Sequence, residues 1–183
     1  MDFDPLTGNL WDTENGPSFA DEINLVVPGF NSGWDKVQGD RKPILSNGMP
    51  GNLTVYPQKS LVDFGGKGKY HSPEFTWFQK PIGPTALKFF NSDKWGNKYK
   101  NDMFVGDIHR GYLYHFKLDH DRNGLLFPKG PLADKIEYWP QELQPVVFAR
   151  GFGGITDLQI GPDDGYLYVL SYDGNIFRIV PSG

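Results

Sequence analysis

The segment FDPLTGNLWDTE (Phe3–Glu14) has a counterpart near the other end of the chain, IGPDDGYLYVLS (Ile160–Ser171). Aligned without a gap, the two segments share a proline, a glycine and a leucine, which in the first are Pro5, Gly8 and Leu10. A tight turn followed by alternating apolar and polar residues is typical of a half-buried strand that follows a hairpin turn. The chain therefore carries an internal repeat of β-hairpins.

A second repeat lies further along the chain, where FVGDIHRGYLYHF (Phe104–Phe116) aligns with LYVLSYDGNIFRI (Leu167–Ile179). Gly111 falls on Gly174 in the turn of each copy. Self-similar units of about four strands are the sequence signature of propeller blades. We therefore predict an all-β fold that forms part of a β-propeller.

The strand pattern predicts about three four-stranded blades, over residues 1–34, 85–149 and 150–183, with a Gly/Pro-rich irregular insertion over about residues 35–84. Three blades cannot close a ring, and open sheet edges promote aggregation. We therefore expect the domain to be partial, with further blades ahead of Met1 and no signal peptide in this segment.

Composition narrows the possible functions. The net charge of −4 and the lack of a basic run argue against nucleic-acid binding, and no apolar run is long enough to span a membrane. The absence of cysteine excludes disulfides, zinc thiolate sites and cysteine nucleophiles.

The stretch LWDTENGPSFADEINLVV (Leu10–Val27) concentrates chemistry in one loop. Two strand-like runs flank Glu14, Asp21 and Glu22, which surround the turn pair Gly16-Pro17. Carboxylates beside backbone carbonyls are the ligands that calcium prefers. A solvated acidic hairpin loop would show the same composition, so both interpretations stay open at this point.

Several motifs in order identify a family resemblance: TENGPSFADEINLV, PGFNSGW, IGPTALKFF, FVGDIHRGYLYHFKLD and FARGFGGITDLQIGPDDGYLYVL. Together they resemble the soluble quinoprotein glucose/sorbosone dehydrogenases. These proteins are six-bladed propellers that use pyrroloquinoline quinone (PQQ) and calcium to oxidise sugars. The resemblance implies a sugar substrate, an external electron acceptor and an extracytoplasmic (periplasmic or secreted) location, and leaves the oligomeric state unknown.

The resemblance also implies metal ligands. Gly16 and Pro17 match the carbonyl pair that binds the quinone-associated calcium, and Glu22 matches a ligand of a second, structural calcium. Asn15 and Asp21 match polar groups that line the cofactor site. The remaining ligands of the structural calcium would come from backbone carbonyls near Ser32 and Gln38, together with the carboxylate of Asp40.

The cationic clamp for the quinone carboxylates matches less well. His109, with Arg110 beside it, occupies the place of a family lysine, while Gly154 and Thr156 replace the two arginines of an Arg-x-Arg-Asp pattern. Arg150 is a possible substitute. The resemblance places the catalytic histidine ahead of Met1, so we expect no catalytic residue in this segment and no turnover by it alone. The alternative is a non-catalytic, calcium-stabilised propeller that binds carbohydrate or protein.

One further motif resembles a metal site. Asp119, Asp121 and Asn123 have the spacing of the first half of an EF-hand loop, but Gly130 replaces the glutamate that such a loop needs at its twelfth position. We therefore predict a polar turn between strands.

Overall fold

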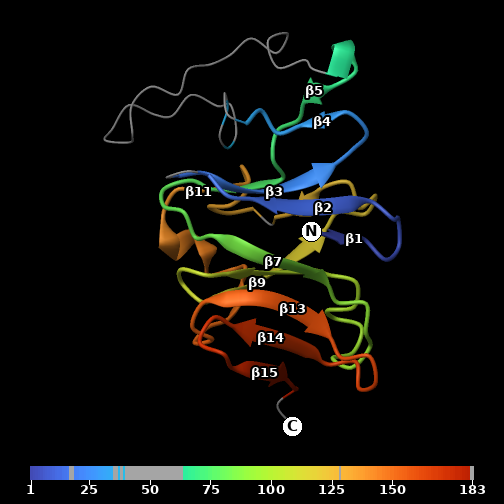
Figure 1. Cartoon of the computed structure of the whole chain (residues 1–183), viewed down its shortest axis with the longest axis vertical. Helices are drawn as coiled ribbons and strands as arrows, with labels where there is room; N and C mark the ends of the chain where they lie inside the picture. The colour runs from blue at the N-terminus through green and yellow to red at the C-terminus, as the bar shows by residue number, and fades with distance from the viewer. Residues whose placement is uncertain (17–18, 35–36, 38, 40–63, 128, 182–183) are drawn as a thin grey trace.

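The computed structural model is an all-β molecule whose sheets follow one another along its longest axis (Figure 1). It describes residues 1–16, 19–34, 37, 39, 64–127 and 129–181. The predicted all-β class is therefore confirmed. Three candidate ligands, Pro17, Gln38 and Asp40, lie outside the described residues.

The first sheet has five strands in the order β1-β2-β3-β6-β11. Their bounds are Asp2–Phe3 (β1), Leu10–Glu14 (β2), Asp21–Val26 (β3), Phe75–Trp77 (β6) and Ile136–Glu137 (β11). Strand β6 lies inside the stretch from 35 to 84 that the sequence predicts to be irregular. Its aromatic and β-branched residues favour a strand, and it pairs antiparallel with β3.

The second sheet places its strands in the order β10-β9-β8-β7, and β12 also pairs with β9. Their bounds are Pro84–Phe89 (β7), Met103–Asp107 (β8), Leu113–Leu118 (β9), Leu125–Leu126 (β10) and Val147–Ala149 (β12).

The third sheet contains Ile155–Ile160 (β13), Leu167–Ser171 (β14) and Ile176–Ile179 (β15). The remaining elements are β4 (Phe30–Asn31), which pairs with β5 (Lys69–Tyr70), and two 3-10 turns, η2 (Phe64–Gly66) and η3 (Pro140–Leu143). No helix in the described part of the chain is long and apolar enough to cross a bilayer.

Two apolar cores hold the three sheets together. Between the first and second sheets, Trp11, Phe75 and Trp77 pack with Tyr114 and Phe116. The rings of Phe75 and Trp77 meet edge to face, with centroids 4.9 Å apart. A second core joins the second and third sheets; it includes Phe104, Leu113, Ile155, Leu167 and Val169. The first sheet covers one face of the second sheet, and the third sheet covers the other. The three sheets therefore pack as adjacent propeller blades do.

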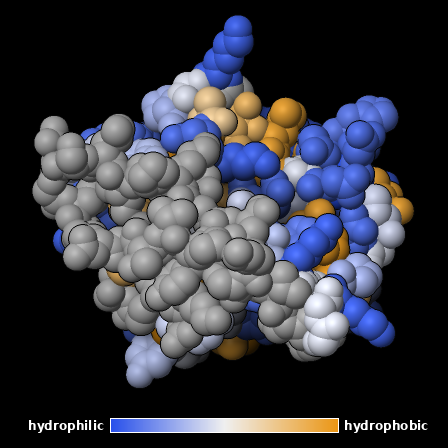
Figure 2. Space-filling model, turned by 90° about the horizontal axis from the view of Figure 1, so that it is seen from above, coloured by the Kyte–Doolittle hydropathy of each residue, from blue (hydrophilic) through white to orange (hydrophobic). Residues whose placement is uncertain are grey.

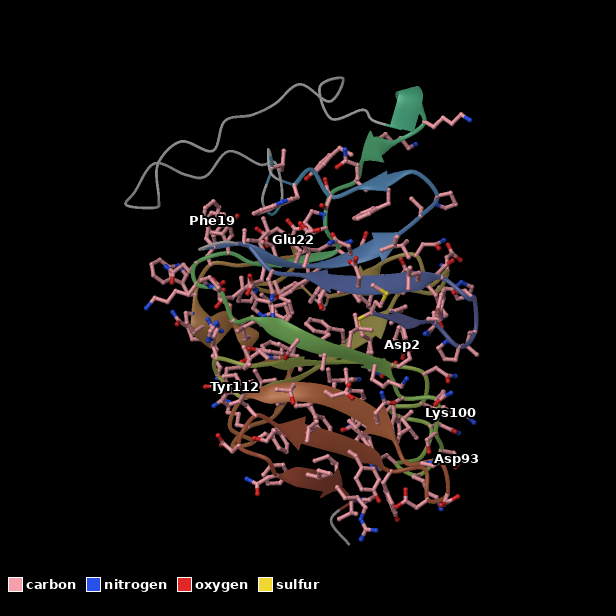
Figure 3. All side chains as sticks on the ribbon, viewed as in Figure 1. Asp2, Phe19, Glu22, Asp93, Lys100 and Tyr112 are labelled. Carbon is pink, nitrogen blue, oxygen red and sulfur yellow. The ribbon has the colours of Figure 1, made fainter. Side chains whose placement is uncertain are left out.

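The loops that carry the candidate residues lie on one side of the molecule. Figure 3 places Phe19, from the β2–β3 loop, and Tyr112, from the β8–β9 loop, on the same side, with Asp93 and Lys100 on the opposite side. The end that carries β4 and β5 is mostly hydrophilic over its described surface, and its hydrophobic residues form separate patches (Figure 2). The candidate residues therefore come from loops that share one side of the molecule.

Candidate functional site

Asp21 joins the loops of the first two sheets. It begins β3, its side chain is fully buried, and one carboxylate oxygen accepts the Gly16 N–H at 2.8 Å. The other oxygen accepts the N–H groups of Ile82 at 2.6 Å and Gly83 at 2.8 Å. One carboxylate thus fixes both the Gly16 turn and the segment that enters β7.

Two glycines make this close approach possible. A Cβ atom on Gly16 would collide with the carbonyl oxygen of Phe19. Gly83 has a φ of +62°, and a Cβ there would lie 3.3 Å from Cδ2 and 3.4 Å from Nε2 of His109. The His109 N–H also donates to the Ile82 carbonyl at 3.1 Å. The imidazole of His109 therefore lies over Gly83, beside the segment that Asp21 holds.

The β2–β3 hairpin has one apolar and one polar face. The register pairs Asp12 with Asn24 and Glu14 with Glu22, and side chains at alternate positions share a face. Glu22 and Asn24 are buried, whereas Asp12 and Glu14 are half-buried. Three carboxylates and an amide thus share the face of the hairpin that points away from the second sheet, while Trp11 on the opposite face packs in the core.

Burial raises the pKa of these carboxylic acids. The pKa of Glu22 rises to about 8, because desolvation and the charge of Glu14 outweigh the hydrogen bond from the Gly39 N–H. Desolvation also raises the pKa values of Glu14, despite a hydrogen bond with Ser32, and of Asp12, despite one with Asn24. A cation placed on this face would reverse that cost.

Several buried oxygen atoms on this face lack a hydrogen-bond partner among the described residues. Asp12 Oδ1, Asn24 Oδ1 and Thr76 Oγ1 are buried and make no hydrogen bond to any described residue. Oxygen-only donors suit calcium. However, no three Asp, Glu or His side chains among the described residues converge closely enough to hold a metal alone. The residues therefore fit a calcium ion only if backbone carbonyls or the undescribed Gln38 and Asp40 add ligands.

The other predicted site residues take varied positions. Asn15 is exposed at the start of the loop that holds Gly16. Ser32 forms a hydrogen bond with Glu14, the cross-strand partner of Glu22, and therefore lies at the polar face. Arg110 points inward, with its Nη1 atom 3.6 Å from Oε1 of Glu137. Arg150 stacks on Tyr112, with the guanidinium carbon 4.8 Å from the ring centroid.

Comparison with known proteins decides the family. The sequence profile of the Glucose / Sorbosone dehydrogenase family matches residues 1–178. The chain belongs to this family. The resemblance stated on the sequence motifs is therefore confirmed.

Relatives of the glucose/sorbosone dehydrogenase family confirm the fold. The chain is 27% identical to aldose sugar dehydrogenase YliI of Escherichia coli (strain K12), over 99% of this chain and 41% of that protein. Two solved structures are similar in fold. One is the soluble aldose sugar dehydrogenase (Asd) from Escherichia coli in its apo-form, with a TM-score of 0.57 and 22% identity. The match covers 97% of this chain and 42% of that chain. The PQQ-bound form of aldose sugar dehydrogenase from Streptomyces coelicolor has a TM-score of 0.54 at 16% identity, over 96% and 40%.

Coverage limits what these comparisons show. The chain spans about 41% of the length of the curated relative and a similar share of the solved structures. The propeller assignment is therefore confirmed for a partial set of blades. The activity of a whole family member remains a proposal for this protein.

Two positions of this dehydrogenase-family chain differ from the cationic clamp that the sequence resemblance implies. A Cβ on Gly154 would lie 2.6 Å from the Ile108 carbonyl oxygen, so a larger side chain there requires the loop to shift. The Thr156 hydroxyl donates to the Leu170 carbonyl at 3.2 Å, within the third sheet. One basic side chain of the β8–β9 loop does lie at Gly83. It is His109, whose ring atoms would lie 3.3 and 3.4 Å from a Cβ on that glycine.

Sequence reasoning missed four contributors to the site. Ile82 and Gly83 supply backbone N–H groups to Asp21, and the Pro-x-Gly-Pro turn around them was a usable signal. Asp12 and Asn24 extend the polar face, which strict alternation along β2 and β3 could have indicated. Their significance depends on burial, and no single-sequence pattern reports it.

Proposed function

We propose that this chain forms the calcium- and quinone-binding part of a sugar dehydrogenase-like oxidoreductase. The single observation that carries the proposal is the buried Asp21 carboxylate, which joins the Gly16 turn to Gly83 beneath His109. A loop that must aim a backbone carbonyl at a metal needs such rigid support. The family match over residues 1–178 includes this loop, and the motif resemblance supports it as the candidate cofactor site.

Two calcium positions belong to the proposal. The carbonyl oxygens of Gly16 and Pro17 would bind calcium beside the quinone. Glu22 would bind a second calcium together with groups near Ser32, Gln38 and Asp40. The buried, unpartnered oxygens beside Glu22 and the raised pKa of its carboxyl support a cation-binding role for this face.

The residues of this chain would bind and orient the cofactor. PQQ, when bound, accepts a hydride equivalent from the sugar. Asp21 would fix the backbone of Gly16, and Asn15 would line the open side of the loop. His109, when protonated, would neutralise one cofactor carboxylate. The sugar substrate, the external electron acceptor and the extracytoplasmic location are parts of the same proposal.

Calorimetry with calcium tests the metal part directly. Wild-type chain, freed of metal with a chelator, should bind calcium, and Glu22→Gln should lose the site that does not depend on quinone. Asp163→Asn, which removes an exposed carboxylate, is the matched control and should bind as wild type. If the wild-type chain binds no calcium at millimolar concentration, the proposal is wrong.

Quinone binding and turnover are tested separately. Quenching of protein fluorescence by PQQ should require calcium in the 183-residue chain. Reduction of a dye with a panel of aldoses should then be measured on the longest natural form of the protein. If PQQ does not bind at micromolar concentration, the proposed enzyme function is wrong.

A second function is supported by one observation. A Cβ on Gly154 would lie 2.6 Å from the Ile108 carbonyl oxygen, so the first clamp arginine would require this loop to shift. A calcium-stabilised propeller that binds carbohydrate or protein without PQQ would tolerate this loss. Calcium binding without quinone binding would favour this scaffold function.

A further inference from the structure

The β8–β9 loop, which carries His109, is held from below by Asp107. The Asp107 side chain is fully buried, and one of its oxygens accepts the N–H groups of Arg110 and Gly111. Its other oxygen accepts the Tyr114 hydroxyl at 2.8 Å. Desolvation raises the pKa of Asp107 and also that of the Tyr114 phenol. Asp107 therefore supports the loop backbone at Arg110 and Gly111.

The Arg110 side chain reaches toward β11, the strand at the end of the first sheet. Its side chain is 18% exposed, and its Nη1 atom lies 3.6 Å from Oε1 of Glu137, whose side chain is 0% exposed. Glu137 lies on β11, the short strand that pairs in parallel with β6. The chain segment from 119 to 140 thus returns to the first sheet and places one acid beneath the loop.

The Arg110–Glu137 pair is buried but poorly hydrogen-bonded. Neither Glu137 oxygen nor Arg110 Nη1 has a hydrogen-bond partner among the residues that the structure describes. Two charges buried in this way gain from each other only part of what they lose in hydration. Desolvation accordingly raises the pKa of Glu137 to about 7, although Arg110 opposes the rise. Because the net stabilisation by such a pair is small, we look for its role in the direction of the Arg110 side chain.

We propose that Glu137 is a positioning residue that holds the Arg110 guanidinium against β11, so that His109 is the basic side chain of the β8–β9 loop that lies beside Gly83. The inference rests on the proposed function, because it concerns how an anionic cofactor is selected. With Arg110 paired to Glu137, the loop offers a polycarboxylate one of its two basic side chains, His109, instead of both. Glu137 then lowers the affinity of this face for polyanions.

Fluorescence titration with PQQ in the presence of calcium tests the effect on binding. Glu137→Gln should bind PQQ about three- to tenfold more tightly than wild type, because Arg110 is released toward the anion. Glu142→Gln is the matched control: it removes a carboxylate that acts on Glu137 without facing Arg110, and should give no such gain. Equal affinities of wild type and Glu137→Gln would overturn the proposal, provided that both bind PQQ.

A cofactor-free measurement separates this inference from the proposed function. In protein labelled with ¹⁵N-arginine, the Arg110 side-chain resonance, identified by its loss in Arg110→Gln, should shift in Glu137→Gln. The Arg122 resonance should stay unchanged, since Arg122 pairs with Asp4 instead. An unmoved Arg110 resonance would refute the positioning role even if PQQ binds. If no variant binds PQQ but the resonance moves, the proposed cofactor fails and the positioning role stands.

The unmutated protein offers the same test should Glu137→Gln not fold. The titratable groups facing Arg110 are Glu137 on β11, Asp107 on β8 and Tyr114 on β9, and Glu142 of η3 acts on Glu137. The Arg110 resonance should titrate near neutral pH as Glu137 gains its proton. A flat profile between about pH 5.5 and pH 8.5 would contradict the inference.

Discussion

Asp21 and Glu22 are sequence neighbours with opposite surroundings. Asp21 accepts three backbone N–H groups, which replace the water that its carboxylate loses on burial. Glu22 accepts the N–H of Gly39 and a 3.3 Å bond from Asn24, and lies near two other carboxylates. Because adjacent residues of a strand point to opposite faces, one carboxylate supports a loop and the other lies in an acidic cluster.

The raised pKa of Glu22 predicts how the unfolding free energy of the metal-free protein depends on pH. Its pKa of about 8 in the folded protein exceeds the ordinary glutamate value, so its contribution is complete at low pH and is lost as pH rises through 8. In a chelator, Glu22→Gln should exceed wild type in unfolding free energy by roughly 2–4 kcal/mol at alkaline pH. Urea unfolding between about pH 5 and pH 9 measures this. An identical pH slope in the two proteins would contradict the prediction.

The three hydrogen bonds to Asp21 predict a loss of stability when its carboxylate is replaced. In Asp21→Asn, the amide group cannot accept all three N–H groups, so buried donors remain unpaired. We expect a loss of roughly 3 kcal/mol in unfolding free energy, with faster amide exchange at Ile82 and Gly83. Asp93→Asn, at an exposed position on the opposite side of the molecule (Figure 3), is the control. Equal stabilities of the two variants would show that the Asp21 contacts do not matter.

At the scale of elements, glycines let the loops of neighbouring sheets touch. Gly111, in the β8–β9 loop, and Gly174, in the β14–β15 loop, were aligned by the sequence repeat, and both have positive φ angles, +63° and +82°. Their surroundings differ. A Cβ on Gly111 would collide with the Gly153 carbonyl oxygen, whereas a Cβ on Gly174 would meet no atom within 4 Å. The repeat therefore predicts the turn, and packing decides which copy tolerates a side chain.

These two glycines form a matched pair for mutagenesis. Gly174→Ala should cost about 1 kcal/mol, the strain of an alanine at positive φ. Gly111→Ala carries the same strain and must also push the β8–β9 loop away from Gly153, so it should cost at least about 2 kcal/mol more. Thermal unfolding of both variants gives the comparison. Equal losses would show that the contact between the second and third sheets is unimportant.

Strands with regular alternation could be predicted from the sequence, and most others could not. The repeat aligns Leu10 with Leu167, and these two residues begin β2 and β14 in the structure. β6 and β11 were missed because each has only two or three residues and gains its partner from a distant part of the chain. Such strands depend on tertiary contacts, which local pattern does not encode.

The candidate site was predictable where a motif carried it. The Gly16-Pro17 turn and Asp21 came from motif order, and the structure joins Gly16 to Asp21 directly. The inward direction of Arg110 was not predictable from the sequence. Its partner, Glu137, lies on β11, a short strand that follows β10 of the second sheet in the chain but pairs with β6 of the first sheet. Long-range pairs of this kind appear only when the fold is known.

At the scale of the whole molecule, the two ends of the stack differ. The first sheet is followed by β4 and β5 and a mostly hydrophilic described surface (Figure 2), whereas the third sheet ends at β15 (Figure 1). Leu170 on β14 and Ile176 on β15 are cross-strand partners, 39% and 70% exposed. Neighbouring apolar side chains on the outer face of a terminal sheet resemble half of an inter-sheet core, and this chain spans only about 41% of its relative.

The exposed face of the third sheet predicts association of the 183-residue chain. Leu170→Lys combined with Ile176→Glu places opposite charges across the strand pair, which replaces the apolar contact without repulsion. Light scattering during gel filtration, from micromolar to millimolar concentration, should show wild type forming oligomers and this variant remaining monomeric. Leu126→Lys, at a 56% exposed position of β10, should associate as wild type does. A wild-type chain that stays monomeric throughout would show that this face is stable in water without a partner.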